Sequence, residues 1–351
     1  MRWAYTRNLW IKSLCFFYVF SLMLLWVNVI PVFAKAPTSS KILFTSARDG
    51  NRDVYIMNPD GSEQVNLTQH PADDQQAVWS PTGEQILFAS NRGHKVWGSW
   101  DLYLMDPDGK NVRRVFKKET FRKDATWSPD GKQIAYNNIN WDAGESHIYI
   151  ATLGEQEEER IVEGFDPAWS PNGTELAYVT YLLNTRRVTL IDVRTKKTER
   201  LLPRKATPWQ NNPSWSAAGD KLAFSWNTHK VPPVEAGRAV WNAWEVTETI
   251  YIVNRDGTGL KQLVEEDGPY AQSPALSPNG QEVLYTQKIN GYFQVFKVNV
   301  NSGITTQLTH IIGASLLQAN AGGAWFDPAY ALPVSPQPHL LTTTWGEIKN
   351  K

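Results

Sequence analysis

Few side chains in this sequence have the types and spacing that catalysis requires. The single cysteine, Cys15, lies in an apolar N-terminal segment, so the rest of the chain has no thiol for nucleophilic or disulfide chemistry. No Gly-x-Ser-x-Gly nucleophile elbow, P-loop or glycine-rich dinucleotide motif occurs. The six histidines show neither HxH nor HExxH spacing. This pattern favours binding over catalysis, and it leaves open a metal held jointly by histidines from several loops.

Tryptophan is the unusual residue, with 16 copies in 351 residues. A signature Trp-Ser-x-x-Gly begins at Trp79, Trp127, Trp169 and Trp215. A fifth copy has Leu276 in the tryptophan position, and a sixth, altered copy contains Trp325. Successive copies are 48, 42, 46, 61 and 49 residues apart. This period is typical of the four-stranded blades of a β-propeller.

The segments after each signature read as strands and tight turns. A short apolar strand follows the glycine, as in residues 86–88, and an alternating strand comes next, as in residues 101–105. A turn such as residues 106–109, Asp-Pro-Asp-Gly, then leads to an edge strand. The sequence therefore predicts an all-β fold, a six-bladed β-propeller of four-stranded antiparallel blades.

The two ends of the repeat predict how the ring closes. The first blade begins at residues 41–44 with what is a second strand in the other blades. A lone first-strand copy lies at about residues 322–326. We expect this C-terminal strand to pair with the first blade, because closure removes an open sheet edge.

The repeat resembles that of the TolB propeller and its WD40-like PD40 relatives, over about residues 41–328. The resemblance implies a periplasmic protein that binds other envelope proteins, among them a peptidoglycan-associated lipoprotein. TolB also has an N-terminal α/β domain, and only about six residues separate the predicted export signal from the first strand here. We therefore expect a TolB-like protein that lacks this domain.

The predicted domains are a signal peptide at residues 1–34, the propeller at residues 35–328 and a tail at residues 329–351. Arg2, Arg7 and Lys12 precede an apolar run, and Ala34 ends a cleavage motif. Cleavage predicts a periplasmic or secreted protein that is not embedded in the membrane, and an uncleaved anchor remains the alternative. The mature chain then has 35 − 3 = 32 basic and 35 acidic residues, which argues against nucleic acid as a partner.

One face of the propeller is predicted to bind the partner. The first-to-second and third-to-fourth strand turns are short on one face, whereas the other face has long, variable loops. We expect a binding face on these long loops, and the alternative is that the same rings form a small core under the loops. The predicted binding tryptophans are Trp97, Trp100, Trp141, Trp209, Trp241 and Trp244.

Polar residues three positions before the tryptophan of each repeat are predicted to surround the mouth of the central channel. They are Gln76, Asp124, Asp166 and Asn212, and Ser273 and Gly322 complete the set. A cation near Asp124 and Asp166 is one interpretation, and capping of the loop backbone is the other. No dedicated cofactor is expected.

Together these observations predict a non-catalytic, protein-binding scaffold in the cell envelope. Two alternatives use the same face: a glycan-binding propeller, and a metal-dependent enzyme similar to oligogalacturonide lyases. The lyase requires the loop histidines to converge on one point, and His70, His94, His147, His229 and His310 fall on this face.

Overall fold

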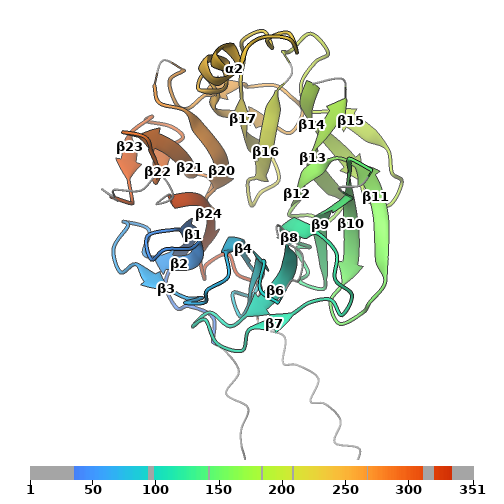
Figure 1. Ribbon diagram of the computed structural model, residues 1–351, viewed down its shortest axis with the longest axis vertical. Helices are drawn as coiled ribbons and strands as arrows, with labels where there is room; N and C mark the ends of the chain where they lie inside the picture. Colours follow the sequence, from blue (N-terminus) through green and yellow to red (C-terminus); the bar gives the residue numbers. More distant parts are fainter. Residues whose placement is uncertain are drawn as a thin grey trace, which may run out of the picture. The chain divides into compact units, whose positions relative to one another are not determined.

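The computed structural model describes residues 35–93, 99–140, 143–182, 185–207, 209–266, 268–310 and 320–333. Within them, 24 strands form six four-stranded antiparallel sheets, which surround a common axis (Figure 1). This arrangement confirms the predicted six-bladed propeller. No helix within these ranges is long and apolar enough to cross a membrane.

The strands of each blade are given from the innermost to the outermost. Blade one contains β24 (Asn320–Phe326), β1 (Lys41–Ser46), β2 (Asp53–Met57) and β3 (Val65–Asn66). Blade two contains β4 (Asp74–Trp79), β5 (Ile86–Ser90), β6 (Asp101–Met105) and β7 (Arg113–Arg114). Blade three contains β8 (Arg122–Trp127), β9 (Gln133–Asn140), β10 (Glu145–Thr152) and β11 (Glu158–Glu163).

The second half of the ring has the same order. Blade four contains β12 (Phe165–Trp169), β13 (Glu175–Leu182), β14 (Thr185–Asp192) and β15 (Thr198–Arg200). Blade five contains β16 (Gln210–Trp215), β17 (Lys221–Trp226), β18 (Thr249–Asn254) and β19 (Lys261–Gln262). Blade six contains β20 (Ala271–Leu276), β21 (Glu282–Ile289), β22 (Tyr292–Asn299) and β23 (Thr305–Gln307).

Blade one is built from both ends of the repeat array. β24 pairs antiparallel with β1, so that Trp325 lies opposite Ile42 and Phe326 lies opposite Lys41. Phe326 is buried, and its ring centroid lies 5.1 Å from that of Trp79 in blade two. The predicted closure by the strand at about residues 322–326 is therefore confirmed.

Apolar side chains between neighbouring blades form the core. Between blades four and five, for example, Val188 and Leu190 pack with Leu222 and Phe224, and all four are buried. The repeated tryptophans also join blades. Trp215 Nε1 donates a hydrogen bond to the Ala168 carbonyl of the preceding blade at 3.1 Å, and Trp325 Nε1 donates to the Ala275 carbonyl at 3.0 Å.

Glycines in the outer turns allow the blades to approach closely. Gly109 lies between β6 and β7 with φ +81°, and a Cβ there would be 2.3 Å from the Leu67 carbonyl oxygen of blade one. Gly303, in the turn between β22 and β23, has φ +72° but no atom within 4 Å of a built Cβ. The two positions share the left-handed backbone and differ in contact with the neighbouring blade.

This difference gives a matched test of inter-blade packing. Gly303→Ala should lower the free energy of unfolding by about 1 kcal/mol, because an alanine is disfavoured in the left-handed region. Gly109→Ala should lower it by about 2–4 kcal/mol, because the methyl group also collides with a backbone carbonyl. Urea unfolding of both variants measures the difference. Equal losses would contradict the close contact between blades one and two.

Candidate functional site: the channel mouth and the tryptophan cluster

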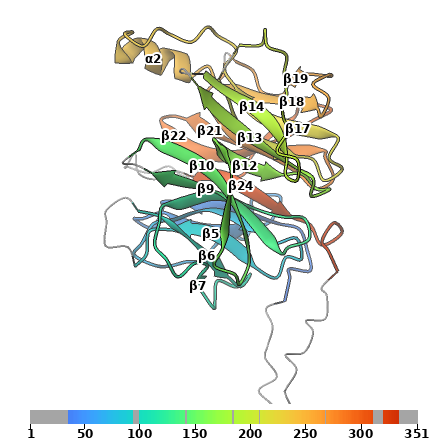
Figure 2. The ribbon, with the colours of Figure 1, turned by 90° about the vertical axis from the view of Figure 1, so that its right-hand side faces the viewer.

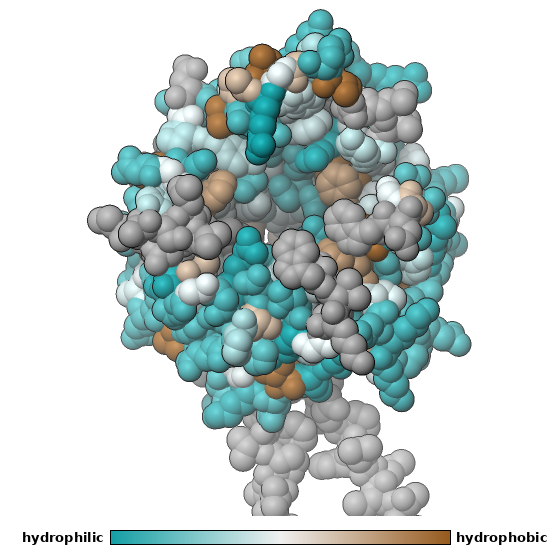
Figure 3. Space-filling view, viewed as in Figure 1, coloured by the Kyte–Doolittle hydropathy of each residue, from teal (hydrophilic) through white to brown (hydrophobic). Residues whose placement is uncertain are grey.

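The face that carries the long loops is defined by where the inner strands begin. Gln210, the first residue of β16, lies opposite Trp226, the last residue of β17. The blade-five insertion, residues 227–248, follows directly and contains the helix α2 (Arg238–Glu245). Figure 2 shows α2 projecting from this side of the ring, and Figure 3 shows the same face with a hollow at its centre.

Every innermost strand carries a β-bulge at the channel mouth. The pairing register shifts at the same place in all six blades, between Asn211 and Ser214 in blade five for example. One residue of each bulge adopts a left-handed backbone, with φ between +49° and +67°. These residues are Gln76, Asp124, Asp166, Asn212, Ser273 and Gly322. Asp, Asn and Gly tolerate this conformation best, which explains the residue types at four of the six positions.

The bulges bring the predicted channel-mouth residues together. All six line one cavity of about 520 Å³. Gln76 Nε2 donates a hydrogen bond to Asp124 Oδ1 in the next blade. Asn212 Nδ2 donates to Asp166 Oδ2 at 3.0 Å, again across a blade boundary. Asp124 and Asp166 thus come from adjacent blades, three and four. Each accepts a hydrogen bond from a side-chain amide of the blade on its other side, Gln76 of blade two or Asn212 of blade five.

The two carboxyl groups influence each other. Burial, and then the negative charge of Asp124, raise the pKa of Asp166 to about 7. Lys123 Nζ lies 3.5 Å from Asp124 Oδ2 and offsets part of the charge. A proton or a cationic group from a ligand can therefore stabilise this mouth, because either relieves the repulsion between two nearby carboxylates.

A cluster of three tryptophans lies on the same face, beside blade five. The ring centroids of Trp209 and Trp244 are 4.8 Å apart, and those of Trp241 and Trp244 are 5.6 Å apart. Trp241 and Trp244 are three residues apart in α2 and so share one side of the helix. Trp209 and Trp244 are buried, whereas Trp241 is half-buried at the edge of the cluster.

Trp209 is held in a strained backbone conformation. Its φ is +91°, which is rare for a bulky residue. Its N–H donates to the Arg186 carbonyl at 2.7 Å, and its carbonyl accepts from the Asn227 N–H at 3.2 Å. The Arg186 guanidinium lies 4.4 Å from the Trp209 ring centroid, a cation–π contact. These contacts fix the position of the ring.

Arg186 and Glu248 connect the cluster to the channel, and sequence reasoning missed both. Arg186 Nη1 donates to Asn211 Oδ1 at 3.3 Å, and Asn211 Nδ2 donates to Glu248 Oε1 at 3.2 Å. Asn211 adjoins the channel residue Asn212. Burial raises the pKa of Glu248 to about 7. No sequence signal marks Glu248, because its burial results from packing of the insertion that it ends.

The remaining predicted residues have different surroundings. Trp100 is half-buried against the core between blades two and three. Trp97, Trp141 and His94 lie outside the described residues. His147 is buried beside Arg160. Among the residues that the structure describes, no three His, Cys, Asp or Glu side chains are grouped to hold a metal.

Comparisons with known proteins agree with this architecture. The sequence matches the family described as TolB beta propeller domain over residues 25–166, 93–234 and 165–322. Of the solved structures, TolB from Acinetobacter baumannii is similar with a TM-score of 0.65 at 16% identity; the match covers 82% of this chain and 66% of that one, just under two thirds.

Two further solved structures have the same fold. A putative TolB from Agrobacterium tumefaciens gives a TM-score of 0.58 at 16% identity, over 82% of this chain and 98% of that one. Hydrazine synthase from Kuenenia stuttgartiensis gives 0.63 at 13% identity, over 85% of this chain and 48% of that one. At these identities the likeness shows a shared fold alone.

The raised pKa of Asp166 predicts a pH dependence of stability. An aspartate whose pKa is higher in the folded than in the unfolded state stabilises the fold at low pH, and this contribution is lost as pH rises from about 4 to about 7. Asp166→Asn keeps an acceptor for Asn212 and a side chain that tolerates the left-handed backbone. Between pH 5 and 8, wild type should therefore lose about 1 kcal/mol or more of stability relative to this variant.

Urea unfolding at several pH values measures the difference. Asp124→Asn should reduce the same pH dependence in part, because it removes the neighbouring charge. Parallel pH profiles for wild type and Asp166→Asn would show that the Asp166 carboxyl has no raised pKa.

Proposed function

The chain belongs to the TolB β-propeller family, and on this premise we propose that it is a non-catalytic, protein-binding propeller of the bacterial cell envelope. Residues 1–34 serve as a cleaved signal peptide, and the mature chain acts in the periplasm or after secretion. The observation that carries the proposal is the loop face, where an acidic channel mouth adjoins a partly exposed tryptophan cluster on a rigid ring.

The channel mouth is suited to a cationic group of a protein partner. Asp124 and Asp166 lie together in a cavity of about 520 Å³, which is wide enough for a lysine or arginine side chain. An incoming ammonium or guanidinium group would lower the pKa of Asp166 again and pair with both carboxylates. A metal cation near Asp124 and Asp166 remains a further proposal for the same mouth.

The tryptophan cluster supplies the apolar part of the interface. Trp241 is half-buried and follows Val240, which is 52% exposed, in α2. Its ring contacts the buried rings of Trp209 and Trp244. A fixed aromatic side chain loses little conformational entropy on binding, and such residues dominate the affinity of many protein interfaces. Trp100 stands at a second place on the face, and Trp97 and Trp141 belong to the same prediction.

The partner is proposed to be an envelope protein. The similar proteins from Acinetobacter and Agrobacterium are TolB and a putative TolB, and the family resemblance suggests a peptidoglycan-associated lipoprotein as the first candidate.

Two tryptophan variants test the proposal. The mature protein is used to capture partners from an envelope extract, and the captured protein is then purified for titration. Trp241→Ala should weaken its binding roughly tenfold to thirtyfold, because a half-buried interface tryptophan loses about 1.5–2 kcal/mol on truncation. Its melting temperature should change little, because the ring lies at the edge of the cluster.

Trp127→Ala is the matched control from the core. Trp127 is 8% exposed and packs between blades two and three, so its loss should lower the melting temperature by several degrees and leave the affinity of the folded protein nearly unchanged. The proposal would be wrong if Trp241→Ala and an Asp124→Asn/Asp166→Asn variant both bound the partner with wild-type affinity. The loop face would then not be the binding surface.

A further inference from the structure

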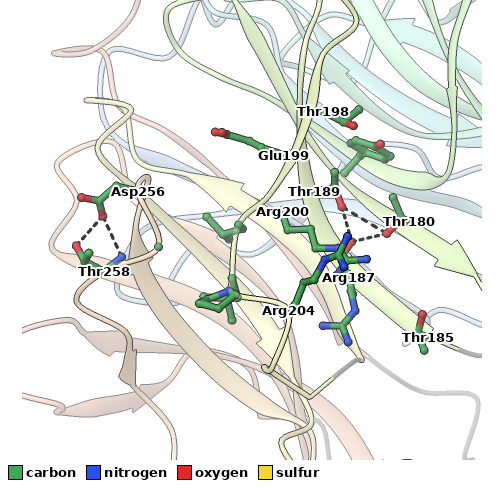
Figure 4. Close-up of a pocket in the computed structure, with 15 residues that line it drawn as sticks. Thr180, Thr185, Arg187, Thr189, Thr198, Glu199, Arg200, Arg204, Asp256 and Thr258 are labelled. Carbon is green, nitrogen blue, oxygen red and sulfur yellow. Dashed lines mark hydrogen bonds between the residues drawn. The ribbon is translucent and has the colours of Figure 1, made fainter.

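A groove on the outer part of blade four lies apart from the channel and the tryptophan cluster. It has a volume of about 820 Å³ and runs along β14 and β15 to the turn between β18 and β19 of blade five (Figure 4). Volumes of this size accept small-molecule ligands rather than single ions. The groove is lined mainly by threonines and arginines.

The part of the chain that forms this groove is strongly basic. Residues 185–205 contain eight Lys and Arg and two Asp and Glu, a net charge of +6, whereas the whole chain has 35 of each sign. The rest of the chain has 35 − 8 = 27 basic and 35 − 2 = 33 acidic residues, so this segment concentrates positive charge. Such a concentration attracts anions to this side of the ring.

Strand register places the polar side chains of the groove on one face of the sheet. Arg187 lies opposite Thr180, and Thr189 lies opposite Arg200. Arg187 and Thr189 are two residues apart in β14, so their side chains point to the same side. Arg187, Arg200 and Arg204 all line the groove (Figure 4), and Arg187 and Arg200 are close enough to interact electrostatically.

The charges of these arginines are not neutralised within the described part of the protein. Arg187 Nη1 donates to the Ala206 carbonyl at 2.9 Å, and among the described residues neither Arg187, Arg200 nor Arg204 forms an ion pair. Burial, and then the positive charge of Arg200, lower the pKa of Arg187. Two guanidinium groups that repel each other would both gain from an anion between them.

The other walls of the groove suit a sugar. Thr198 offers an exposed hydroxyl group, and the Thr180 and Thr189 hydroxyls, which lie 3.2 and 3.4 Å from the Arg187 carbonyl oxygen, also line the groove. Asp256 and Glu199 offer carboxylate acceptors near the edges. These groups can exchange hydrogen bonds with the hydroxyls of a saccharide. The apolar side chains of the lining include Leu201 and Leu202, which are buried, and Pro203. None of the large hydrophobic side chains that are exposed among the described residues lines the groove, so it lacks a large exposed apolar group to insert into a lipid bilayer.

We propose that this groove binds an anionic saccharide, a sugar that carries carboxylate or phosphate groups. Arg187 and Arg200 hold the acidic group, Arg204 closes over it, and the threonines bind the sugar hydroxyls. The site is independent of the proposed protein-binding face, because it lies on blade four outside the channel mouth.

Isothermal titration of the purified exported protein at low salt tests the site. The probes are a hyaluronan tetrasaccharide, glucose 6-phosphate, inorganic phosphate and neutral maltotetraose. Vesicles of phosphatidylglycerol are tested separately by co-sedimentation. At least one of the two anionic sugars should bind more tightly than inorganic phosphate, and its affinity should fall as salt is raised. Maltotetraose and the vesicles should not bind.

A charge-matched pair of variants separates a built site from general attraction. Arg187→Ala/Arg200→Ala should lose at least tenfold in affinity for the anionic sugar. Arg194→Ala/Lys197→Ala removes the same charge from an exposed turn outside the groove and should change the affinity by less than twofold. Melting temperatures confirm that both variants are folded.

Several results would overturn the proposal. They are no binding of either anionic sugar, equal losses in the two double variants, equal binding of maltotetraose, or binding of the vesicles alone. Capture of the envelope partner by Arg187→Ala/Arg200→Ala should remain at the wild-type level. The experiment therefore distinguishes failure of the saccharide-binding proposal from failure of the protein-binding proposal for the loop face.

Discussion

Closure of the ring is the constraint on which the remaining structure depends. Each blade is a twisted sheet with apolar side chains on both faces, so it is buried only when a neighbour stands on each side. A ring satisfies all six blades at once, and an open array would leave two apolar faces exposed. The pairing of β24 with β1 provides this closure, and Phe326 then packs against Trp79 of blade two.

The innermost strands show what closure requires of the backbone. All six bulge at the same place, and five of the six left-handed residues there are not glycine. Each such residue has a less favourable backbone energy, which the packing of the surrounding ring must offset. The same bulges bring Gln76, Asp124, Asp166 and Asn212 to a shared cavity. The β-bulges of the innermost strands therefore shape both the ring and its polar channel mouth.

The sequence predicts those features that repeat and is silent on those that do not. Trp127 and Trp169 recur at fixed positions, so blade number, closure and the channel-mouth residues follow from the period. Trp209, Trp241 and Trp244 lie outside the repeat, in a loop and an insertion. Residue type alone does not show whether such a tryptophan ring is buried or exposed. The structure buries two and leaves one partly accessible. Glu248 and Arg186 acquire their roles only through this packing.

The overall charge of the chain is likewise a poor guide to the ligands that it binds. A chain with 35 basic and 35 acidic residues suggests no preference for charged ligands. Yet the fold places Asp124 beside Asp166 at the channel and Arg187 beside Arg200 on the rim. Because exposed charges interact over only about 10 Å at ordinary salt, each group acts through its local surroundings. Net neutrality is thus compatible with an acidic mouth and a basic groove that attract ligands of opposite charge.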